Sequence, residues 1–337
     1  MMKLQEAWRG LAGRSRVARL VDVHLRGAGQ VMLQNNPLTG LLFIIGIVWG
    51  AFAAGNVAVA IGALVGLIVS TLMAILLNAD RASLQQGMYG FNGLLVGIAV
   101  PTMLANSPSM WLLLFLGAAV STVIMLAVSQ VMKIWHTPAL TFPFVLTTWF
   151  LTLAAYSFGH VGIVAMGPPA FPAAMTASAV DMDATFFLTS WLKGPAQVFL
   201  IGNVVTGLIF IAALLMNSVW SAIFALGGSA VSIIFAVLMG ASASDIHAGL
   251  YSFSAVLTAI ALGCVFHKPS WRVALFALLG TVFTVVVQAA LDTAVSPLGI
   301  PTFTAPFVFV TWLFLLPRTD LEPHPHAPID KGIVTGE

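Results

Sequence analysis

Ten apolar runs, separated by short polar breaks, make up most of the chain. They lie at residues 38–54, 57–77, 88–105, 111–132, 138–160, 204–217, 219–239, 249–266, 272–291 and 301–317. A helix needs about 20 apolar residues to cross the hydrocarbon core of a membrane, and most of these runs approach that length. The 337 residues include only 13 Lys or Arg and 11 Asp or Glu, too few to cover the surface of a water-soluble globule. The sequence therefore predicts an all-α polytopic membrane protein with ten transmembrane helices, and it excludes soluble enzymes and nucleic-acid-binding proteins.

Basic residues are concentrated on one predicted side of the membrane, and cytoplasmic segments of membrane proteins are rich in Lys and Arg. Those before the first run are Lys3, Arg9, Arg14, Arg16, Arg19 and Arg26. With ten spans, the others that fall on the same side are Arg81, Lys133, Lys268, Arg272, Arg318 and Lys331. Only Lys193 falls on the opposite side, as does the connection at 161–190 with Asp181 and Asp183. We therefore expect a protein of the cell (inner) membrane with both termini cytoplasmic. We also expect an uncleaved N-terminal segment and a disordered tail at 321–337.

The chain resembles itself in three blocks that occur in the same order. Residues 25–31 match 192–198 at an offset of 167, residues 87–99 match 249–261 at 162, and residues 138–149 match 301–312 at 163. Each copy holds five runs, and an odd number makes the second copy enter the membrane from the opposite side, which predicts two inverted five-helix repeats. The expected divisions are an N-terminal basic segment at 1–19, a first membrane repeat at 20–160, an extracytoplasmic linker at 161–186, a second membrane repeat at 187–317 and a cytoplasmic tail at 318–337.

A short segment precedes the long runs of each copy, at about 20–35 and about 187–202. Each is too short to span and is matched in the other copy, which predicts a re-entrant half-helix. Backbone that ends within the membrane is tolerated where it is buried in protein or lines water. Gln30 and Gln197 lie near the predicted ends, where unpaired carbonyl groups form an array of acceptors. They are candidates for lining a pore; the alternative is hydrogen bonding that holds helices together.

Thr141 and Thr304 open the last run of each copy, and a proline follows each of them two residues later. Thr with Pro in the first turn is common at helix starts, so a capping role is one interpretation. If the helix begins within the membrane, the hydroxyl groups would instead add acceptors to a pore.

An apolar face recurs in both copies. Phe91 with Leu95, and Phe253 with Leu257, are each four residues apart and therefore lie on one side of a helix. Such faces usually contact lipid or core, but the repeat makes these residues pore candidates.

The sequence lacks the residues that several functional classes need. No Asp, Glu, Lys or Arg lies in the middle of an apolar run, although ion-coupled carriers usually need one, so the passive flow of a neutral solute is favoured. The histidines do not pair at helical spacing, and Cys264 is alone, so neither a metal site nor an intrachain disulfide is expected. No nucleophile motif is present, and Asp80 and Asp245 are expected to cap helices. We expect neither an enzyme nor a cofactor.

Motifs at 25–31, 35–40 and 87–97, with Phe142-Pro143-Phe144 and Thr148-Trp149, resemble the urea transporter family, the passive urea channels of bacteria and vertebrates, and the chain is similar to a bacterial member. The resemblance covers about 25–317. It implies a homotrimer in membrane lipid, with one urea pore inside each protomer and aromatic slots flanked by ladders of oxygen atoms. One departure is Val204, which stands where the first copy has Pro37.

The resemblance also implies roles for the matched residues. Phe91 and Phe253 would form the slots beside Leu95 and Leu257, while Thr141 and Thr304 would supply hydroxyl groups. Gln30 and Gln197 would lie near the two mouths. Val198, like Leu33, is apolar where a further aromatic ring would complete a slot.

Urea is flat and neutral, and it loses several kcal/mol per polar group if it leaves water without new hydrogen bonds. A slot that admits a flat molecule, with acceptors along its edges, would replace those bonds without any ionised group. The sequence leaves open a channel of the same fold for another small amide or for ammonia, and also an ion-coupled secondary transporter.

Overall fold

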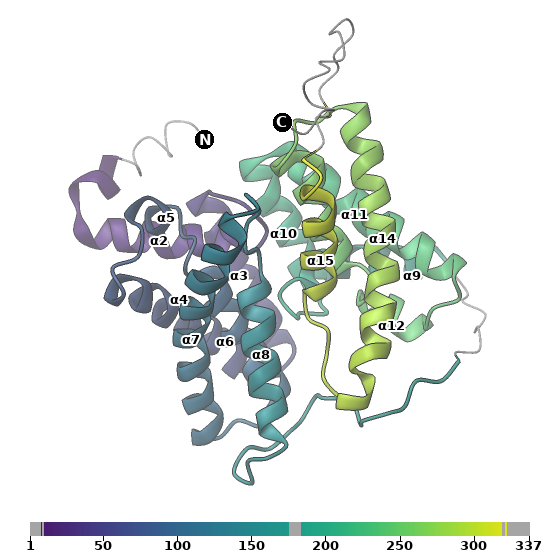
Figure 1. Ribbon diagram of the computed structural model, residues 1–337, viewed down its shortest axis with the longest axis horizontal. Coiled ribbons are helices and arrows are strands. Elements are labelled where there is room, and N and C mark those ends of the chain that lie inside the picture. The colour runs from purple at the N-terminus through teal and green to yellow at the C-terminus, as the bar shows by residue number, and fades with distance from the viewer. Residues whose placement is uncertain (1–7, 9, 175–182, 319–320, 322–337) are drawn as a thin grey trace, which may run out of the picture.

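Helices follow the predicted apolar runs in the computed structural model, which describes residues 8, 10–174, 183–318 and 321 (Figure 1). The first series is α2 (Arg16–Gln30), α3 (Pro37–Ala53), α4 (Val57–Leu76), α5 (Arg81–Gln85), α6 (Phe91–Met103), α7 (Pro108–Lys133) and α8 (Phe142–Ala155). The second is α9 (Ala184–Gln197), α10 (Val204–Asn217), α11 (Val219–Leu238), α12 (Ala243–Ala248), α13 (Phe253–Ile260) with a π-helical turn η1 (Ala261–Val265), α14 (Trp271–Val295) with a 3-10 turn η2 (Ser296–Leu298), and α15 (Ala305–Leu315). Asp181 and all of the predicted disordered tail except Leu321 lie outside the described residues.

Among the described residues, four helices are long and apolar enough to cross a membrane, namely α4, α7, α11 and α14 with η2. The other six apolar helices are shorter, between 10 and 17 residues. Four of these, α6, α8, α13 and α15, begin three or four residues after the predicted start of their runs, because turns precede them. The all-helical, apolar architecture agrees with the predicted class, while the count of ten spans stays a prediction.

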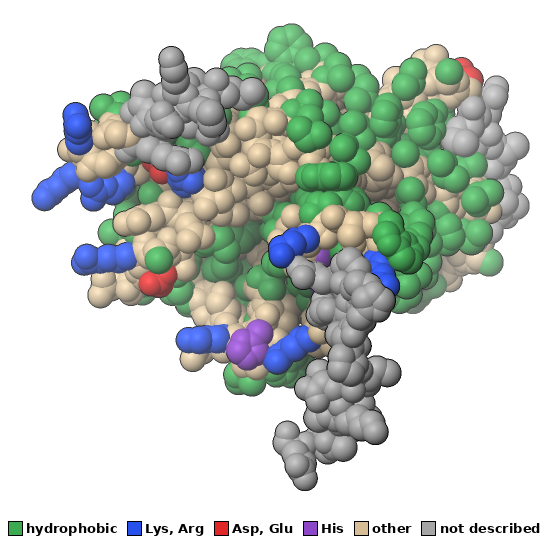
Figure 2. Space-filling view, turned by 90° about the horizontal axis from the view of Figure 1, so that it is seen from above, with side chains coloured by type: hydrophobic (Ala, Val, Ile, Leu, Met, Phe, Trp, Pro, Cys, Tyr) green, Lys and Arg blue, Asp and Glu red, His purple; other side chains and the backbone are tan. Residues whose placement is uncertain are grey.

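The long helices expose apolar side chains on one face. On α4 the exposed side chains recur every three or four residues, at Ile61, Leu64, Ile68, Leu72 and Ile75. A helix that faces water would carry charges there, whereas lipid tails accept such a surface without cost. Apolar side chains are also prominent on the face in Figure 2, where Lys and Arg lie mostly around the edge and few Asp or Glu are visible.

The opposite face of α4 packs against α6, and every residue of α6 except Thr102 is buried. Glycines permit this close approach. A Cβ atom placed at Gly62 would collide with the carbonyl oxygen of Gly97, and one placed at Gly97 would collide with that of Gly62. Helix α6 is therefore held at the centre of its half of the molecule.

The earlier helices and the later helices form two groups that lie side by side in Figure 1, and α3 packs against α10 where the groups meet. Thr39 Oγ1 donates to Ala213 O at 2.9 Å, and Thr206 Oγ1 donates to Gly46 O at 3.1 Å. These two bonds cross the contact in opposite directions.

Asparagine caps determine where α3 and α10 begin. Asn36 Oδ1 accepts from the N–H groups of Leu38 and Thr39, and Asn203 Oδ1 accepts from Thr206 N–H. Helix α10 therefore starts at the expected residue although Val204 replaces the proline, because Asn203 caps the helix by accepting from Thr206 N–H.

Of the two predicted aspartate caps, one is confirmed. Asp80 caps α5 by accepting from Ser83 N–H, and this hydrogen bond is the main reason that the pKa of Asp80 lies below its ordinary value. The prediction for Asp245 is wrong, because Ser242 caps α12 and Asp245 lies in the first turn of that helix.

Candidate functional site

Thr141 and Thr304 meet in the buried interior of the molecule. Their hydroxyl oxygens are 2.7 Å apart and both side chains are buried. Each residue directly precedes its helix, α8 or α15, but neither hydroxyl caps that helix. The capping interpretation is therefore wrong for the side chains. Two hydroxyl groups from positions 163 residues apart instead form one polar point in an apolar interior.

Two tryptophans bind the segments that lead into these threonines. Trp149 Nε1 donates to Pro301 O at 2.9 Å, and Trp312 Nε1 donates to Pro138 O at 2.8 Å. Each indole thus holds the segment just before the other helix. The two bonds fix α8 and α15 relative to each other, and they bring Thr141 and Thr304 into contact.

Gln30 and Gln197 are the last residues of α2 and α9. Gln30 Nε2 donates to Gln86 O, and Gln197 Nε2 donates to Ala248 O, both at 2.8 Å. The amide nitrogens therefore hold neighbouring segments together, as the packing interpretation expects. Among the described residues no hydrogen bond to either amide oxygen is present, so both oxygens remain acceptors.

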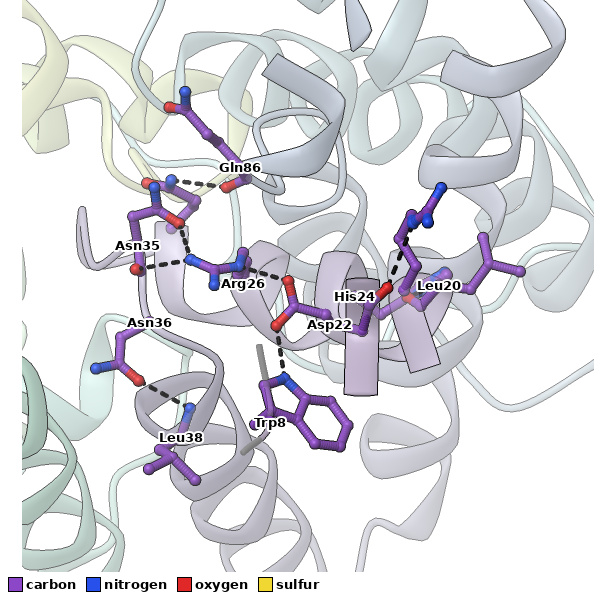
Figure 3. A network of polar contacts seen from close by, with 12 residues as sticks. Trp8, Leu20, Asp22, His24, Arg26, Asn35, Asn36, Leu38 and Gln86 are labelled. Carbon is purple, nitrogen blue, oxygen red and sulfur yellow. Dashed lines mark hydrogen bonds and ion pairs between the residues drawn. The ribbon is translucent and has the colours of Figure 1, made fainter. Parts of the chain in front are cut away.

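An ion pair anchors the end of α2 (Figure 3). Arg26 Nε lies 2.7 Å from Asp22 Oδ2, and Arg26 also donates to the backbone and side-chain oxygens of Asn35, as Figure 3 shows. Trp8 Nε1 donates to the second carboxylate oxygen of Asp22. This network fixes the chain where α2 ends and turns toward α3. In the second copy Lys193 and Gly202 stand at the positions of Arg26 and Asn35, so the network belongs to one half.

The predicted slot residues are all buried. Phe91 and Phe253 are the first residues of α6 and α13, and Leu95 and Leu257, one turn further along, are fully buried. The apolar faces therefore turn inward rather than toward lipid.

A cavity of about 630 Å³ reaches part of this set. It is lined by Gln197, Val198, Phe253 and Thr304 among the predicted residues. The other predicted residues, Gln30, Phe91, Leu95, Thr141 and Leu257, do not line it. The cavity therefore connects the surface to the second copy's candidates and to one member of the threonine pair.

The whole membrane region matches a known family. The family model described as "Urea transporter" matches residues 21–319. The chain belongs to the urea transporter family. Urea transporter 1 of Ovis aries is 31% identical over 332 residues, covering 95% of this chain and 83% of the relative. Urea transporter 1 of Rattus norvegicus is 30% identical over 320 residues, covering 94% and 81%. As a member of the urea transporter family, the chain is a membrane-embedded, multi-pass protein and a transporter rather than an enzyme.

In this urea transporter family member, two aromatic rings of the cavity were not predicted from the sequence. Phe144 and Phe303 line it, with their ring centroids 5.2 Å apart and their planes at 67° in an edge-to-face arrangement. Phe144 N–H donates to Asn92 Oδ1 at 3.1 Å, which fixes the start of α8. The matched Pro143-Phe144 pair was a signal for the first ring. Phe303 has no such signal, because its role depends on an unusual backbone conformation.

Phe303 has a φ of 49°, in the left-handed region that side chains other than glycine rarely adopt. Leu140, at an offset of 163, has a φ of 52°. Leu33 and Leu200, at an offset of 167, have φ values of 63° and 55°. Such conformations persist where surrounding structure over-determines them, and they cluster at functional sites. Here they occur next to the ends of α2 and α9 and the starts of α8 and α15.

Proposed function

We propose that the chain conducts urea and close analogues passively through a narrow pore within each protomer. The family and its relatives, which are named Urea transporter 1, support urea as the substrate. The observation that carries the route is the contact of Thr141 with Thr304, because a solute that crosses between the two halves would meet both hydroxyl groups there.

The proposed path runs between the ends of the two half-helices. In order along it, the residues are Gln30, Phe91, Leu95, Thr141, Thr304, Leu257, Phe253, Val198 and Gln197. The amide oxygens of Gln30 and Gln197 would accept from urea N–H groups at the two mouths. The rings would exclude hydrated ions, and the threonine hydroxyls would replace water at the narrowest point.

We further propose ten spans in two inverted repeats at 20–160 and 187–317, with α2 and α9 as re-entrant half-helices. Helices that follow all ten runs support this arrangement, as do the reciprocal tryptophan bonds. The repeated positive φ values at equivalent positions support it too.

The proposed orientation places both termini, with the segments at 1–19 and 318–337, in the cytoplasm, and the linker at 161–186 outside the cell (inner) membrane. The positive-inside distribution of Lys and Arg supports it. A homotrimer in membrane lipid is proposed on the family resemblance, and the exposed apolar faces of the long helices suit both lipid and subunit contacts.

Purified protein in liposomes tests this function. Urea efflux, followed by stopped-flow light scattering, should be fast, saturable and unaffected by a proton or sodium gradient. Efflux that rises with either gradient would establish the ion-coupled alternative. Efflux of acetamide or ammonia without efflux of urea would establish a different solute for the same fold.

A further inference from the structure

Three polar side chains form a cluster on the wall of the cavity that leads to Thr304. Gln288 and Asp292 are one turn apart on α14, and Thr302 lies in the segment before α15. Gln288 Nε2 lies 2.9 and 3.0 Å from the two carboxylate oxygens of Asp292 and 2.8 Å from Thr302 Oγ1. Thr302 Oγ1 donates to Asp292 Oδ1 at 3.1 Å. These bonds hold the carboxylate in a fixed position.

The amide nitrogen of Gln288 forms hydrogen bonds, whereas its amide oxygen forms none with the described residues. Gln288 is only 3% exposed, and its nitrogen makes the contacts to both oxygens of Asp292 and to Thr302. Its oxygen Oε1 is buried and has no hydrogen-bond partner among the described residues, although Gln288 lines the cavity. A buried acceptor without a donor lowers stability by about 1–3 kcal/mol. A ligand that donates an N–H or O–H group to this oxygen would remove that cost.

The cavity is acidic. Asp245, on α12, lines it together with Asp292, and no Lys or Arg belongs to the described residues that line it. No group of three or more His, Cys, Asp or Glu that could hold a metal ion occurs in the described part of the chain. The charge therefore favours a cation, and the sparse ligand set favours an organic cation that forms hydrogen bonds.

The corresponding place in the first half has different chemistry. At an offset of 163, Met125 stands for Gln288, Ser129 for Asp292 and Ala139 for Thr302. The hydroxyl of Ser129 contacts the sulfur of Met125 at 3.8 Å. The acidic cluster therefore belongs to one mouth only, so it is not part of the matched set from which the pore was predicted.

We propose that Asp292 and Gln288 form a binding site for planar cations of the guanidinium class at this mouth. A guanidinium ion has the flat shape and paired N–H donors of urea, plus a positive charge. One edge can donate to the carboxylate of Asp292, in the paired geometry that carboxylates favour, while another N–H reaches Gln288 Oε1. The bound cation blocks the cavity and hence the entry of urea from that side. Only this blocking step rests on the proposed function; the binding step does not.

Equilibrium dialysis of the detergent-purified protein with radiolabelled guanidinium chloride, at constant total salt, tests the binding. The wild type should bind about one guanidinium per chain, and Asp292→Asn should weaken binding about ten-fold, because one charge-assisted contact is lost. Gln288→Met, which installs the residue found at the equivalent place in the first half, should also weaken it. Asp183→Asn, which removes a charge at the start of α9 but keeps the cap, should not change it. Absent or non-saturable binding to the wild type, or equal affinity for Asp292→Asn, would overturn the proposal.

A flux measurement separates this proposal from the proposed function. In liposomes, guanidinium on the side of the acidic cavity should slow the efflux of urea in the wild type and not in Asp292→Asn. Binding without any urea flux would refute urea conduction and leave the site intact. Urea flux without guanidinium binding would refute the site alone.

Discussion

At the scale of single residues, two matched pairs of side chains, the tryptophans and the threonines, bond across the molecule rather than within their own halves. The indole N–H groups of Trp149 and Trp312 pair with backbone carbonyls of the opposite segment, and the threonines that they position touch each other. A buried carbonyl without its donor costs more than a lost surface bond.

Trp149→Phe should therefore lower the free energy of unfolding by about 1 kcal/mol or more, since it keeps the ring but leaves Pro301 O without its donor. Thermal unfolding of the detergent-purified protein measures the change. Trp49→Phe, at an exposed position on α3, is the control and should have little effect. Equal shifts for the two variants would argue against a structural role for the cross-bond.

His267 should make stability depend on pH. It lies in the break before α14, where burial lowers its pKa below the ordinary 6.5. The unfolded chain then takes up the proton at a higher pH than the folded chain, so stability is present above about 6.5 and falls as the pH drops below it. The unfolding temperature should decrease between about pH 7.5 and 5.5, and less steeply in His267→Gln. An unchanged slope in His267→Gln would contradict the assignment.

At the scale of elements, close packing of α4 on α6 depends on the absence of side chains at Gly62 and Gly97. Gly62→Ala would force a methyl group against a backbone carbonyl, which should cost about 1–3 kcal/mol. The same substitution at Gly227 of α11, where nothing lies within 4 Å, should instead stabilise the helix by about 0.5–1 kcal/mol. Opposite shifts in unfolding temperature are expected, and two shifts of the same sign would contradict the packing account.

Most helices could be predicted from the sequence, but the residues at which they begin and end could not. Apolar runs located every long helix, whereas the asparagine caps of α3 and α10 were not predicted. The late starts of α8 and α15 were not predictable, because Leu140 and Phe303 adopt left-handed backbone conformations that tertiary contacts impose. The same limit applies to the site: the repeat singled out Thr141 and Thr304, but their contact could not be read from it. The apolar run ends at residue 291 and therefore predicts Asp292 outside the helix, whereas α14 continues to Val295.

At the scale of the whole molecule, the proposed orientation makes an accessibility prediction. Cys264 is the only cysteine in the chain, so the Cys264→Ala variant has no thiol, and single cysteines can be introduced into it for labelling. In intact cells, a membrane-impermeant thiol reagent should label Asp183→Cys, at the start of α9, and should not label Arg81→Cys, at the start of α5, until the membrane is opened. The reverse pattern would invert the topology, and labelling of both in intact cells would rule out the proposed spans.

The most direct test of the account compares urea efflux from liposomes that contain the wild type, Thr304→Val or Thr304→Ser. Valine keeps the shape but removes the hydroxyl that meets Thr141, whereas serine keeps it. If the hydroxyl pair replaces water at the narrowest point, the loss of about 1 kcal/mol should slow efflux about five-fold in the valine variant, with serine near the wild type. Wild-type efflux from a folded Thr304→Val protein would place the path of urea elsewhere.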